Sequence, residues 1–329
     1  MDDRMMQARG AFCYFSRMLV AFLLAGVSAA VFAFPTKPAA IIVPQAPGGA
    51  NDVLARMVAG KLQEYWGLPV LVDFKPGGGV IVGTQYVARS APDGHVIGLV
   101  TSAHAINPTI NPKLPYDSLR EFVPVARLGF NVIGLAVLPS LGINDVKGLI
   151  ELARSKPDFL SHGSNGIGTG AHLAGELFKY MAGAKMVHVP YKGGAPLYQD
   201  MLGGRVPVAF VILNSAMPLV KSGKLKVLAV TNPGKSAIFP EYPPLSAALP
   251  GYDLTTWSGF IVAAGTPREV VQKISADVIR LANAPDLRPK FDEYGYEVAP
   301  LGAADFDAFI RAEMESKGRL VRDSGAKFE

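Results

Sequence analysis

The sequence is poor in cysteine, and this scarcity excludes several kinds of site. Its only cysteine is Cys13, which precedes an apolar run near the N-terminus. The chain beyond residue 33 therefore cannot form an internal disulfide, use a thiolate in catalysis or bind zinc through cysteine. Cys13 is also in the wrong place for lipoprotein attachment, because it lies before the apolar run. A chain without thiols suits the oxidising compartments that exported proteins meet.

Charged residues are also scarce, at 18% of the chain, and the formal net charge is only +5. The basic residues are scattered, and no stripe of lysine and arginine marks a nucleic-acid surface. We therefore expect no nucleic-acid partner. The hydrophobic fraction of 50% excludes a disordered chain, and 329 residues are enough for two domains of ordinary size.

The first 33 residues have the organisation of a secretory signal peptide. Three arginines precede an uncharged apolar run from Met18 to Phe34, which ends in small residues. We expect cleavage after Ala33 or, as the second choice, after Ala30. Retention of the run as a membrane anchor is the alternative, but its length is at the short limit for a bilayer span. The pattern therefore predicts export.

Beyond residue 38 the chain alternates short β-branched runs with amphipathic helical periods. Strands are expected at Ala39–Pro44, Val70–Phe74 and Val96–Thr101, with helices at Asp52–Tyr65 and Gln85–Ser90 between them. A strand–helix–strand pattern returns between Phe159 and Pro190, followed by further expected strands. We therefore predict an α/β protein of two lobes, each with a central, mostly parallel sheet flanked by helices. Proline-rich stretches around Pro139 and at Phe239–Pro250 are expected to cross between the lobes.

The most informative local feature is a glycine turn between the first strand and the first helix. Its candidate ligand-binding residues are Pro47, Gly48, Gly49, Ala50, Asn51 and Asp52. Glycine lets a backbone approach a ligand closely, and the first amides of a helix have no intrahelical acceptor. The positive end of the helix dipole points at the same place, so such a turn binds a carboxylate without a charged side chain. A tight turn before a capped helix explains the same residues and stays open as the alternative.

A second turn of this kind joins a strand to a helix in the other expected lobe. Its candidate residues are Ser164, Asn165, Thr169 and His172, and Ser102, after the third strand, is a further candidate. Two such turns, one in each lobe, suit a clamp for a dicarboxylate, because ligands of open α/β sheets lie at the carboxyl ends of the strands. Gly166–Ala171 also matches the dinucleotide pattern G-x-G-x-x-A. No acidic residue follows about twenty residues later, where the ribose partner would stand.

The sequence offers no catalytic constellation. We find no histidine that pairs with a carboxylate at metal-ligand spacing on one helix face, and no two carboxylates placed as acid and base. Asp52 and Glu176 are assigned to first turns of helices, where negative charge is favoured. A nucleophile elbow at Ser164 is excluded, because His162 stands where that motif has glycine. We expect no enzymatic activity, no metal and no cofactor.

Ordered motifs from about Pro38 to Ala312 resemble a known family. They include Val43-Pro44-x-x-Pro47-Gly48-Gly49-x-x-Asp52, Pro92-Asp93-Gly94, Ser164-x-Gly166-x-Gly168-Thr169, His172-Leu173-x-x-Glu176, Val189-Pro190-Tyr191-Lys192-Gly193 and Ala264-Gly265-Thr266-Pro267. The chain resembles the Bug/TctC family, the periplasmic solute-binding receptors of tripartite tricarboxylate transporters. The number and order of these motifs make the resemblance specific.

The resemblance implies a two-lobed periplasmic-binding-protein fold, the Venus flytrap, whose C-terminal segment returns to the first lobe. The implied boundaries are 1–33 for the signal peptide, 34–138 plus 247–329 for the first lobe, and 139–246 for the second. It also implies that the cleft between the lobes binds a small organic carboxylate through Pro47–Asp52 and Ser164–His172. The implied partners are the membrane permease subunits of the transporter. We expect a monomer in the periplasm.

Three apolar residues depart from the family pattern near the expected cleft. Val80 and Ile81 replace a small and a polar residue, and Ile167 stands where asparagine is common. The sequence therefore favours a dicarboxylate or an aromatic carboxylate over a highly polar tricarboxylate. Two other functions stay open: a periplasmic sensor that presents its ligand to a signalling kinase, and an enzyme that acts on a carboxylate.

Overall fold

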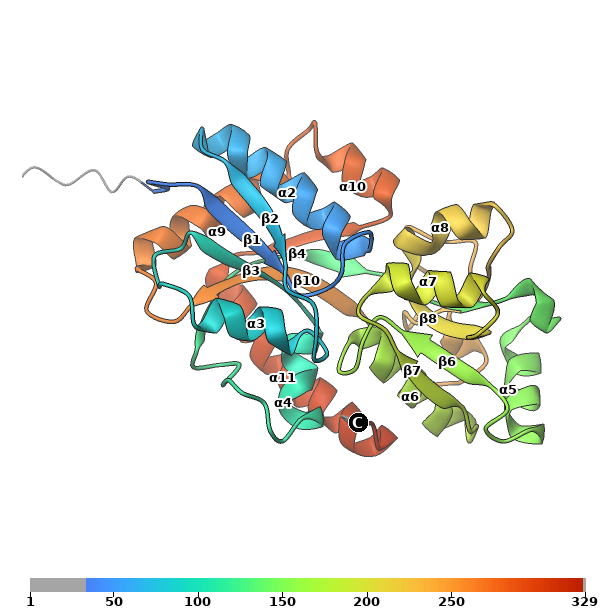
Figure 1. Ribbon diagram of the computed structural model, residues 1–329. Coiled ribbons are helices and arrows are strands. Elements are labelled where there is room, and N and C mark those ends of the chain that lie inside the picture. The colour runs from blue at the N-terminus through green and yellow to red at the C-terminus, as the bar shows by residue number, and fades with distance from the viewer. Residues whose placement is uncertain (1–33, 328–329) are drawn as a thin grey trace, which may run out of the picture. The chain divides into compact units, whose positions relative to one another are not determined.

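A computed structural model describes residues 34–327 of the chain, and the predicted signal peptide at 1–33 lies outside the described residues. Lys37–Glu329 forms one compact unit. Within the described part of the chain, no helix has both the length and the apolar character that a membrane span requires. The unit contains two β-sheets with helices on their faces (Figure 1).

The first sheet has six strands. Their spatial order is β11 (Glu297–Leu301), β4 (Phe122–Asn131), β10 (Thr256–Ala263), β3 (Val96–Thr101), β1 (Ala39–Val43) and β2 (Val70–Phe74). Strand β1 pairs in parallel with β2 and β3, so that Ile41 lies opposite both Val72 and Ile97. Strand β10 runs antiparallel to both β3 and β4. It is buried along its whole length, as its apolar sequence predicts for an interior strand.

The second sheet has five strands. Their spatial order is β7 (Val187–Pro190), β6 (Ser161–Ser164), β8 (Val208–Ile212), β5 (Ile133–Val137) and β9 (Lys226–Val230). Strand β6 is parallel to β7 and β8, whereas β5 is antiparallel to β8 and β9. Both sheets are therefore mixed, where the sequence suggested mostly parallel ones. The reason is that the chain passes from one sheet to the other just before β5 and just before β10. Each of these strands is antiparallel to both of its neighbours.

The helices cover these sheets. They are α2 (Ala50–Trp66), α3 (Ile81–Ala88), α4 (Ala103–Ile110), α5 (Val146–Ser155), α6 (Gly170–Ala182), α7 (Gly194–Leu202), α8 (Leu213–Lys221), α9 (Arg268–Ala282), α10 (Arg288–Tyr294) and α11 (Ala303–Ser324), with 3₁₀ turns η1 (Pro139–Leu141) and η2 (Leu245–Ala247). Helix α5 illustrates why such segments form. The carboxylate of Asp145 caps it by accepting from Gly148 N at 2.8 Å. Its buried stripe of Val146, Leu149 and Ile150 then packs inward.

The chain changes sheets twice. Strand β4 of the first sheet ends at Asn131, and β5 of the second sheet begins at Ile133. The first change therefore occurs at Val132, before position 138, where the resemblance placed the end of the first lobe. The chain returns between Val230 and Thr256, and Leu245, Leu249, Tyr252 and Leu254 of this return pack into the core cluster of the second sheet.

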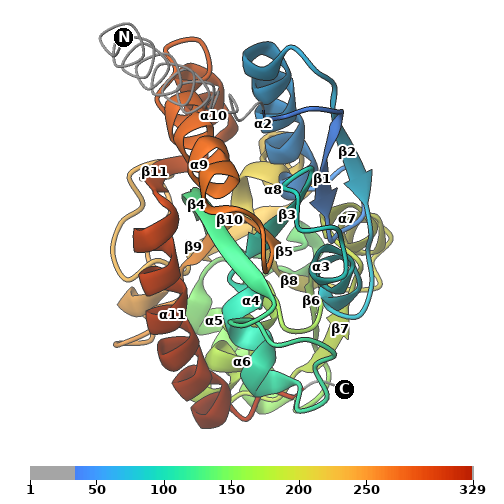
Figure 2. The same cartoon turned by 90° about the vertical axis from the view of Figure 1, so that its left-hand side faces the viewer.

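The C-terminal helix α11 completes both cores. Figure 2 shows it beside α4, and it also packs against α6. Trp257 of β10 meets Phe306 and Phe309 of α11 edge-on, with ring centroids 5.4 and 5.5 Å away, and its indole donates to Glu313 Oε2 at 2.9 Å. Further along, Val321 joins the core cluster of the second sheet. One helix therefore holds the two sheets to each other.

Candidate functional site

The starts of two helices, one from each side of the molecule, meet at the carboxyl ends of β1 and β7. Gly49 precedes α2 with extended backbone, and Gly193 precedes α7. A β-carbon built on Gly49 would lie 3.6 Å from Gly194 N, and one on Gly48 would lie 3.4 Å from Ala195 Cβ. Ala46 N donates to Lys192 O at 2.9 Å, which holds the two loops together. Two positive helix ends thus face the same small space.

A cavity of about 20 Å³ lies between these helix starts. It is lined by Gln45, Ala46, Gly49, Ala50, Asn51, Asn165, Gly193, Gly194, Leu197, Tyr198, Val211, Ile212 and Ser215. None of these residues is charged. Positive potential in the wall therefore comes from the backbone amides at the two helix starts, which have no intrahelical acceptors.

Polar side chains around this small cavity are held by one another. Asn51 Nδ2 donates to Gln45 Oε1, and the Nε2 of Gln45 is buried with no hydrogen-bond partner in the described structure. Ser215 Oγ donates to Ile212 O at 2.9 Å, so that Tyr198 is the donor in the 2.6 Å contact between its hydroxyl and Ser215 Oγ. An unpaired buried amide is costly unless a ligand or water accepts from it. Gln45 Nε2 is therefore a candidate ligand donor.

A larger cavity of about 310 Å³ shares Gln45 and Asn165 with the small one. The loops of the first sheet contribute Pro44, Gln45 and Gly77–Val80, and those of the second sheet contribute Asn165–Ile167 and Pro190–Lys192. Both Val80 and Ile167, which depart from the family pattern, therefore lie in its wall. The only charged residue that lines it is Lys192.

Four of the residues predicted from the sequence meet at the small cavity: Gly49, Ala50, Asn51 and Asn165. Others support the first glycine turn. Asp52 accepts from Gly48 N at 2.8 Å and pairs with Arg56, so its carboxylate satisfies the turn itself. Pro47 and Gly48 are exposed and line neither cavity.

The remaining predicted residues lie behind the second glycine turn. Ser102 is fully buried and its hydroxyl lies 2.6 Å from that of Thr256. Thr169 caps α6, accepting from His172 N at 3.3 Å and donating to Gly166 O at 2.6 Å. Ser164 and His172 are buried, and both contact the side chain of His188 on β7. None of these four lines either cavity.

Gly193 and Gly194 were missed by reasoning from the sequence. Their signal is the same as that of the first turn, because a short strand, Val187–Pro190, leads through two glycines into a helix. The motif that ends in Gly193 contributed to the family resemblance without being assigned to the site. The fold therefore brings together two glycine pairs that each precede a helix, Gly48–Gly49 and Gly193–Gly194.

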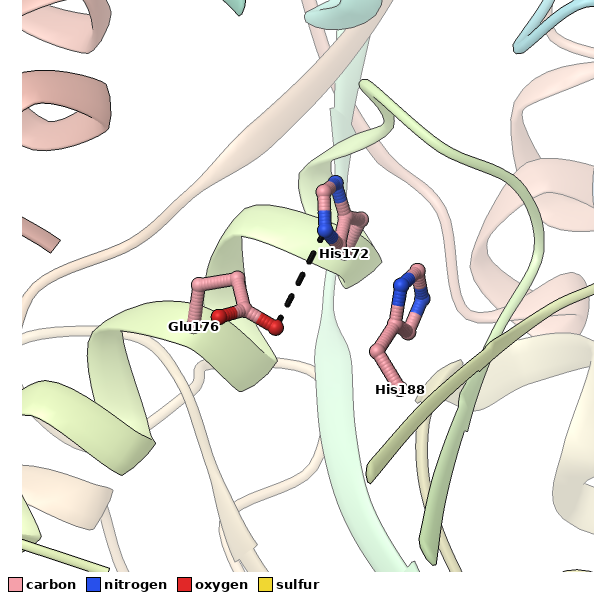
Figure 3. A group of neighbouring side chains, drawn as sticks. All are labelled: His172, Glu176 and His188. Atoms are coloured by element: carbon pink, nitrogen blue, oxygen red, sulfur yellow. Dashed lines mark ion pairs between the residues drawn. The ribbon is translucent and has the colours of Figure 1, made fainter. Parts of the chain in front are cut away.

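A separate group of histidines lies beneath the second glycine turn (Figure 3). His172 and His188 stack with ring centroids 4.1 Å apart, and His162 also stacks with His188, at 5.0 Å. Burial lowers the pKa of His172 to about 4 and, with the neighbouring histidines, that of His188 to about 2, so these rings are neutral. Burial opposes ionisation of Glu176, but His162, whose Nε2 lies 3.4 Å away, and the hydrogen bond from Lys179 lower its pKa to about 2. His172, Glu176 and His188 line a third cavity, of about 470 Å³.

This group corrects two expectations from the sequence. Glu176 lies in the second turn of α6, not the first, and it stands four residues after His172 on the same helix. The expectation that no histidine pairs with a carboxylate at metal-ligand spacing on one helix face is therefore wrong. The donor atoms of His172, Glu176 and His188 all lie within 4.8 Å of one another, which makes them a candidate cation site.

The geometry of these residues does not fit a metal ion. The planes of the stacked His172 and His188 rings differ by only 17°, and two parallel rings cannot both aim a nitrogen at one ion. Gly168 N donates to His172 Nδ1 at 3.1 Å, so the proton of the neutral ring is on Nε2, the nitrogen that faces Glu176. Lys179 already pairs with Glu176 at 2.8 Å. A metal would require all three contacts to change.

The fold has two mixed β-sheets flanked by helices, with a cavity between the loops at the ends of their strands. This arrangement defines a two-lobed solute-binding fold. The chain belongs to TctC, the tripartite tricarboxylate transporter family receptor, which matches residues 54–326. The family and the two-lobed fold expected from the sequence are thereby confirmed.

Similar proteins cover nearly the whole chain. A UPF0065 protein in the tcbD–tcbE intergenic region of Pseudomonas sp. strain P51 is 34% identical, over 88% of this chain and 87% of that protein. Protein BugT of Bordetella pertussis is 30% identical, over 93% and 95% respectively. The structure of R. palustris Rpa4515 with adipate has a TM-score of 0.86 at 30% identity, over 89% of this chain and 99% of that one.

Proposed function

We propose that this protein is a non-enzymatic periplasmic receptor that captures a small organic carboxylate for the membrane permease subunits of a tripartite tricarboxylate transporter. The observation that carries the proposal is the uncharged cavity where α2 and α7 begin. Helix amides converge there from both sides, and such amides hold a carboxylate well because the helix dipoles favour negative charge. The adipate found with the similar protein Rpa4515 is an acid of this kind.

The two cavities suggest how the ligand lies. One carboxylate would occupy the space between the helix starts, beside Asn165 and Gln45, and the rest of the molecule would extend into the larger cavity. Val80, Ile167 and Pro190 line that larger space, and these apolar walls favour an aliphatic or aromatic body. Lys192 offers a charge for a second carboxylate. We therefore propose a dicarboxylate or an aromatic carboxylate as the ligand.

The small cavity has room for about one water molecule and none for a carboxylate. Ligand entry therefore requires the loops at Gly49 and Gly194 to separate, which breaks the hydrogen bond from Ala46 N to Lys192 O. We propose that the two sheets move apart at the crossovers and close on the ligand with a wider space between the helix starts than in the structure described. Closure then follows from tighter binding to the closed state than to the open one.

A thermal-shift screen tests this function on the purified chain from residue 34. At a concentration a hundred times its dissociation constant, a true ligand adds about 2.7 kcal/mol to the free energy of unfolding. For a chain of this size this raises Tm by about 4 °C. The panel should contain citrate, aspartate, adipate and aromatic acids, with hexanoate and 1,6-hexanediol as controls that lack one or both carboxylates of adipate. We expect a shift with adipate or an aromatic acid and none with the diol. If no acid shifts Tm, the receptor function fails, and if only citrate does, the preference for a less polar body fails.

Export is part of the proposal. We propose that residues 1–33 direct the chain to the periplasm and are removed after Ala33, and that the mature chain works as a monomer. The intact mass of the protein recovered from the periplasmic fraction tests the cleavage, and a mass that retains residues 1–33 would contradict it.

A further inference from the structure

The second glycine turn is held from below by side chains that do not line the ligand cavities. The Ser164–Gly170 loop connects β6 to α6, and its residues Asn165, Gly166 and Ile167 line the 310 Å³ cavity. On the other side of the loop, Ser164 Oγ lies 2.8 Å from His188 Nε2, and Gly168 N donates to His172 Nδ1 at 3.1 Å. The loop therefore lies between the cavity and the histidines.

The hydrogen bond between Gly168 and His172 fixes the state of the imidazole ring. A backbone amide can only donate, so Nδ1 must accept and carry no proton. Gly168 is buried and His172 is 2% exposed, so no bulk water replaces this acceptor if it is lost. Gly168 also has a φ of +71°, and a β-carbon added to it would clash with the side chain of Asn107. The loop thus has a left-handed position that only glycine fits, and the amide at that position depends on one ring nitrogen.

The charged and titratable groups that face His172 lie on three elements and near the end of the chain. Glu176 and Lys179 are on α6, His162 is on β6 and His188 is on β7. Lys327, near the end of the chain, lines the same 470 Å³ cavity. Figure 3 shows Glu176 on the Nε2 side of His172, at 3.9 Å, away from the nitrogen that Gly168 uses. Glu176 therefore faces the protonated nitrogen of the neutral ring and leaves the Gly168 contact undisturbed.

We propose that His172 is a positioning residue, which sets ligand affinity by accepting the Gly168 amide and so holding the Ser164–Gly170 loop against the cavity. The inference rests on the proposed receptor function. It assigns His172 a role through the loop in place of the direct ligand contact that the sequence suggested. Protonation of Nδ1 would place two donors against each other, so the loop loses its support when His172 becomes charged.

The direction of the pH effect follows from the burial of the ring. Burial lowers the pKa of His172 from its ordinary value of 6.5 to about 4 in the ordered loop. A released loop exposes the ring and lets its pKa rise toward the ordinary value, so protons favour the released state. Ligand affinity is therefore constant above pH 6.5, and below it affinity falls as far as protonation releases the loop of the ligand-free protein, by at most tenfold per pH unit.

Two substitutions separate the role of the acceptor from that of the ring. His172→Asn places Oδ1 at the position of Nδ1, where it accepts from Gly168 and cannot be protonated. His172→Gln removes the ring equally but places its amide beyond that position. Affinity for the acid identified by the thermal-shift screen, measured by calorimetry at pH 7.5, should stay within about twofold in H172N and fall roughly tenfold or more in H172Q. Equal losses in both variants would overturn the proposal.

The pH profile and the ring itself provide readouts that packing alone does not affect. The affinity of the native protein should fall between pH 6.5 and 5 more steeply than that of H172N, and parallel profiles would overturn the proposal. Nitrogen NMR of the ring, without ligand, should show the proton of His172 on Nε2 at pH 7.5, and a proton on Nδ1 would overturn it. The NMR result does not depend on any ligand, so a failure of the receptor function is distinguishable from a failure of this inference.

Discussion

Replacing Gly49 by valine should weaken ligand binding severely and leave the protein folded. Gly49 has a φ of −99° and a ψ of −179°, which any residue adopts, and its added β-carbon would lie 3.6 Å from Gly194 N, an ordinary contact. Valine is a poorer N-cap than glycine, so we expect a loss of stability of about 1 kcal/mol or less. The branched side chain would nevertheless fill a space of about 20 Å³ and cover the amides of both helix starts.

The size of the effect on binding follows from the hydrogen bonds that the ligand would lose. Each hydrogen bond to a charged group contributes about 1.5–3 kcal/mol, which corresponds to a rise of roughly 13- to 160-fold in Kd. Calorimetric titration with the acid found in the screen measures this rise, and thermal unfolding reports on the fold.

Gly60→Ala is the matched control in the same helix. Gly60 is exposed and a β-carbon there has no neighbour within 4 Å, so alanine should stabilise α2 by about 0.5–1 kcal/mol without changing Kd. A folded G49V variant with the Kd of the native protein would refute a site at the α2 start.

Three further changes test the fold around the site. Gly83→Ala should destabilise the protein by about 1–3 kcal/mol in urea unfolding, because its β-carbon would lie 2.7 Å from Pro44 Cβ; stability within 0.5 kcal/mol of native would contradict this packing. Tyr252→Phe removes a fully buried hydroxyl that donates to Ala174 O at 2.7 Å, and we expect a loss of about 1 kcal/mol and a lower Tm, whereas an unchanged Tm would show that this bond contributes nothing. Burial lowers the pKa of His104 from 6.5 to about 4, so the unfolded chain takes up the proton first and stability falls by about 3 kcal/mol between pH 6.5 and 4. His104→Gln should lose this part of the acid sensitivity, and an identical pH dependence of unfolding would assign it to other groups.

The strongly periodic segments of the chain were predictable from the sequence. Strand β1 and helix α2 have clear apolar patterns and lie close to their expected positions, Ala39–Pro44 and Asp52–Tyr65. Helices α4 and α8 were not predicted, because each contains an internal proline, Pro108 and Pro218, and a proline usually marks the end of a helix. Strand β11 was missed for a similar reason, since Pro300 interrupts an edge strand.

The candidate site was predictable only in part, because the sequence does not show which loops meet in space or in which direction a side chain points. The sequence shows that a glycine turn precedes a helix, but it does not show which turns meet across the molecule. Gly49 meets Gly194 because β1 and β7 belong to different sheets whose loops face each other. His172 has the residue type and position of a ligand contact, yet its ring points under the loop toward His188 (Figure 3). Side-chain direction of this kind depends on packing between strands that are distant in sequence.

The place of β10 in the first sheet has a consequence for how the chain acquires its structure. This strand lies between β3 and β4, although it follows them by more than a hundred residues in sequence. The first 131 residues therefore contain strands on both sides of a gap that only Thr256–Ala263 can fill. A growing chain cannot close this sheet until about four fifths of it has been made, and pairing over such distances is slow. The topology itself thus delays completion of the first sheet until the portion after residue 255 has been made.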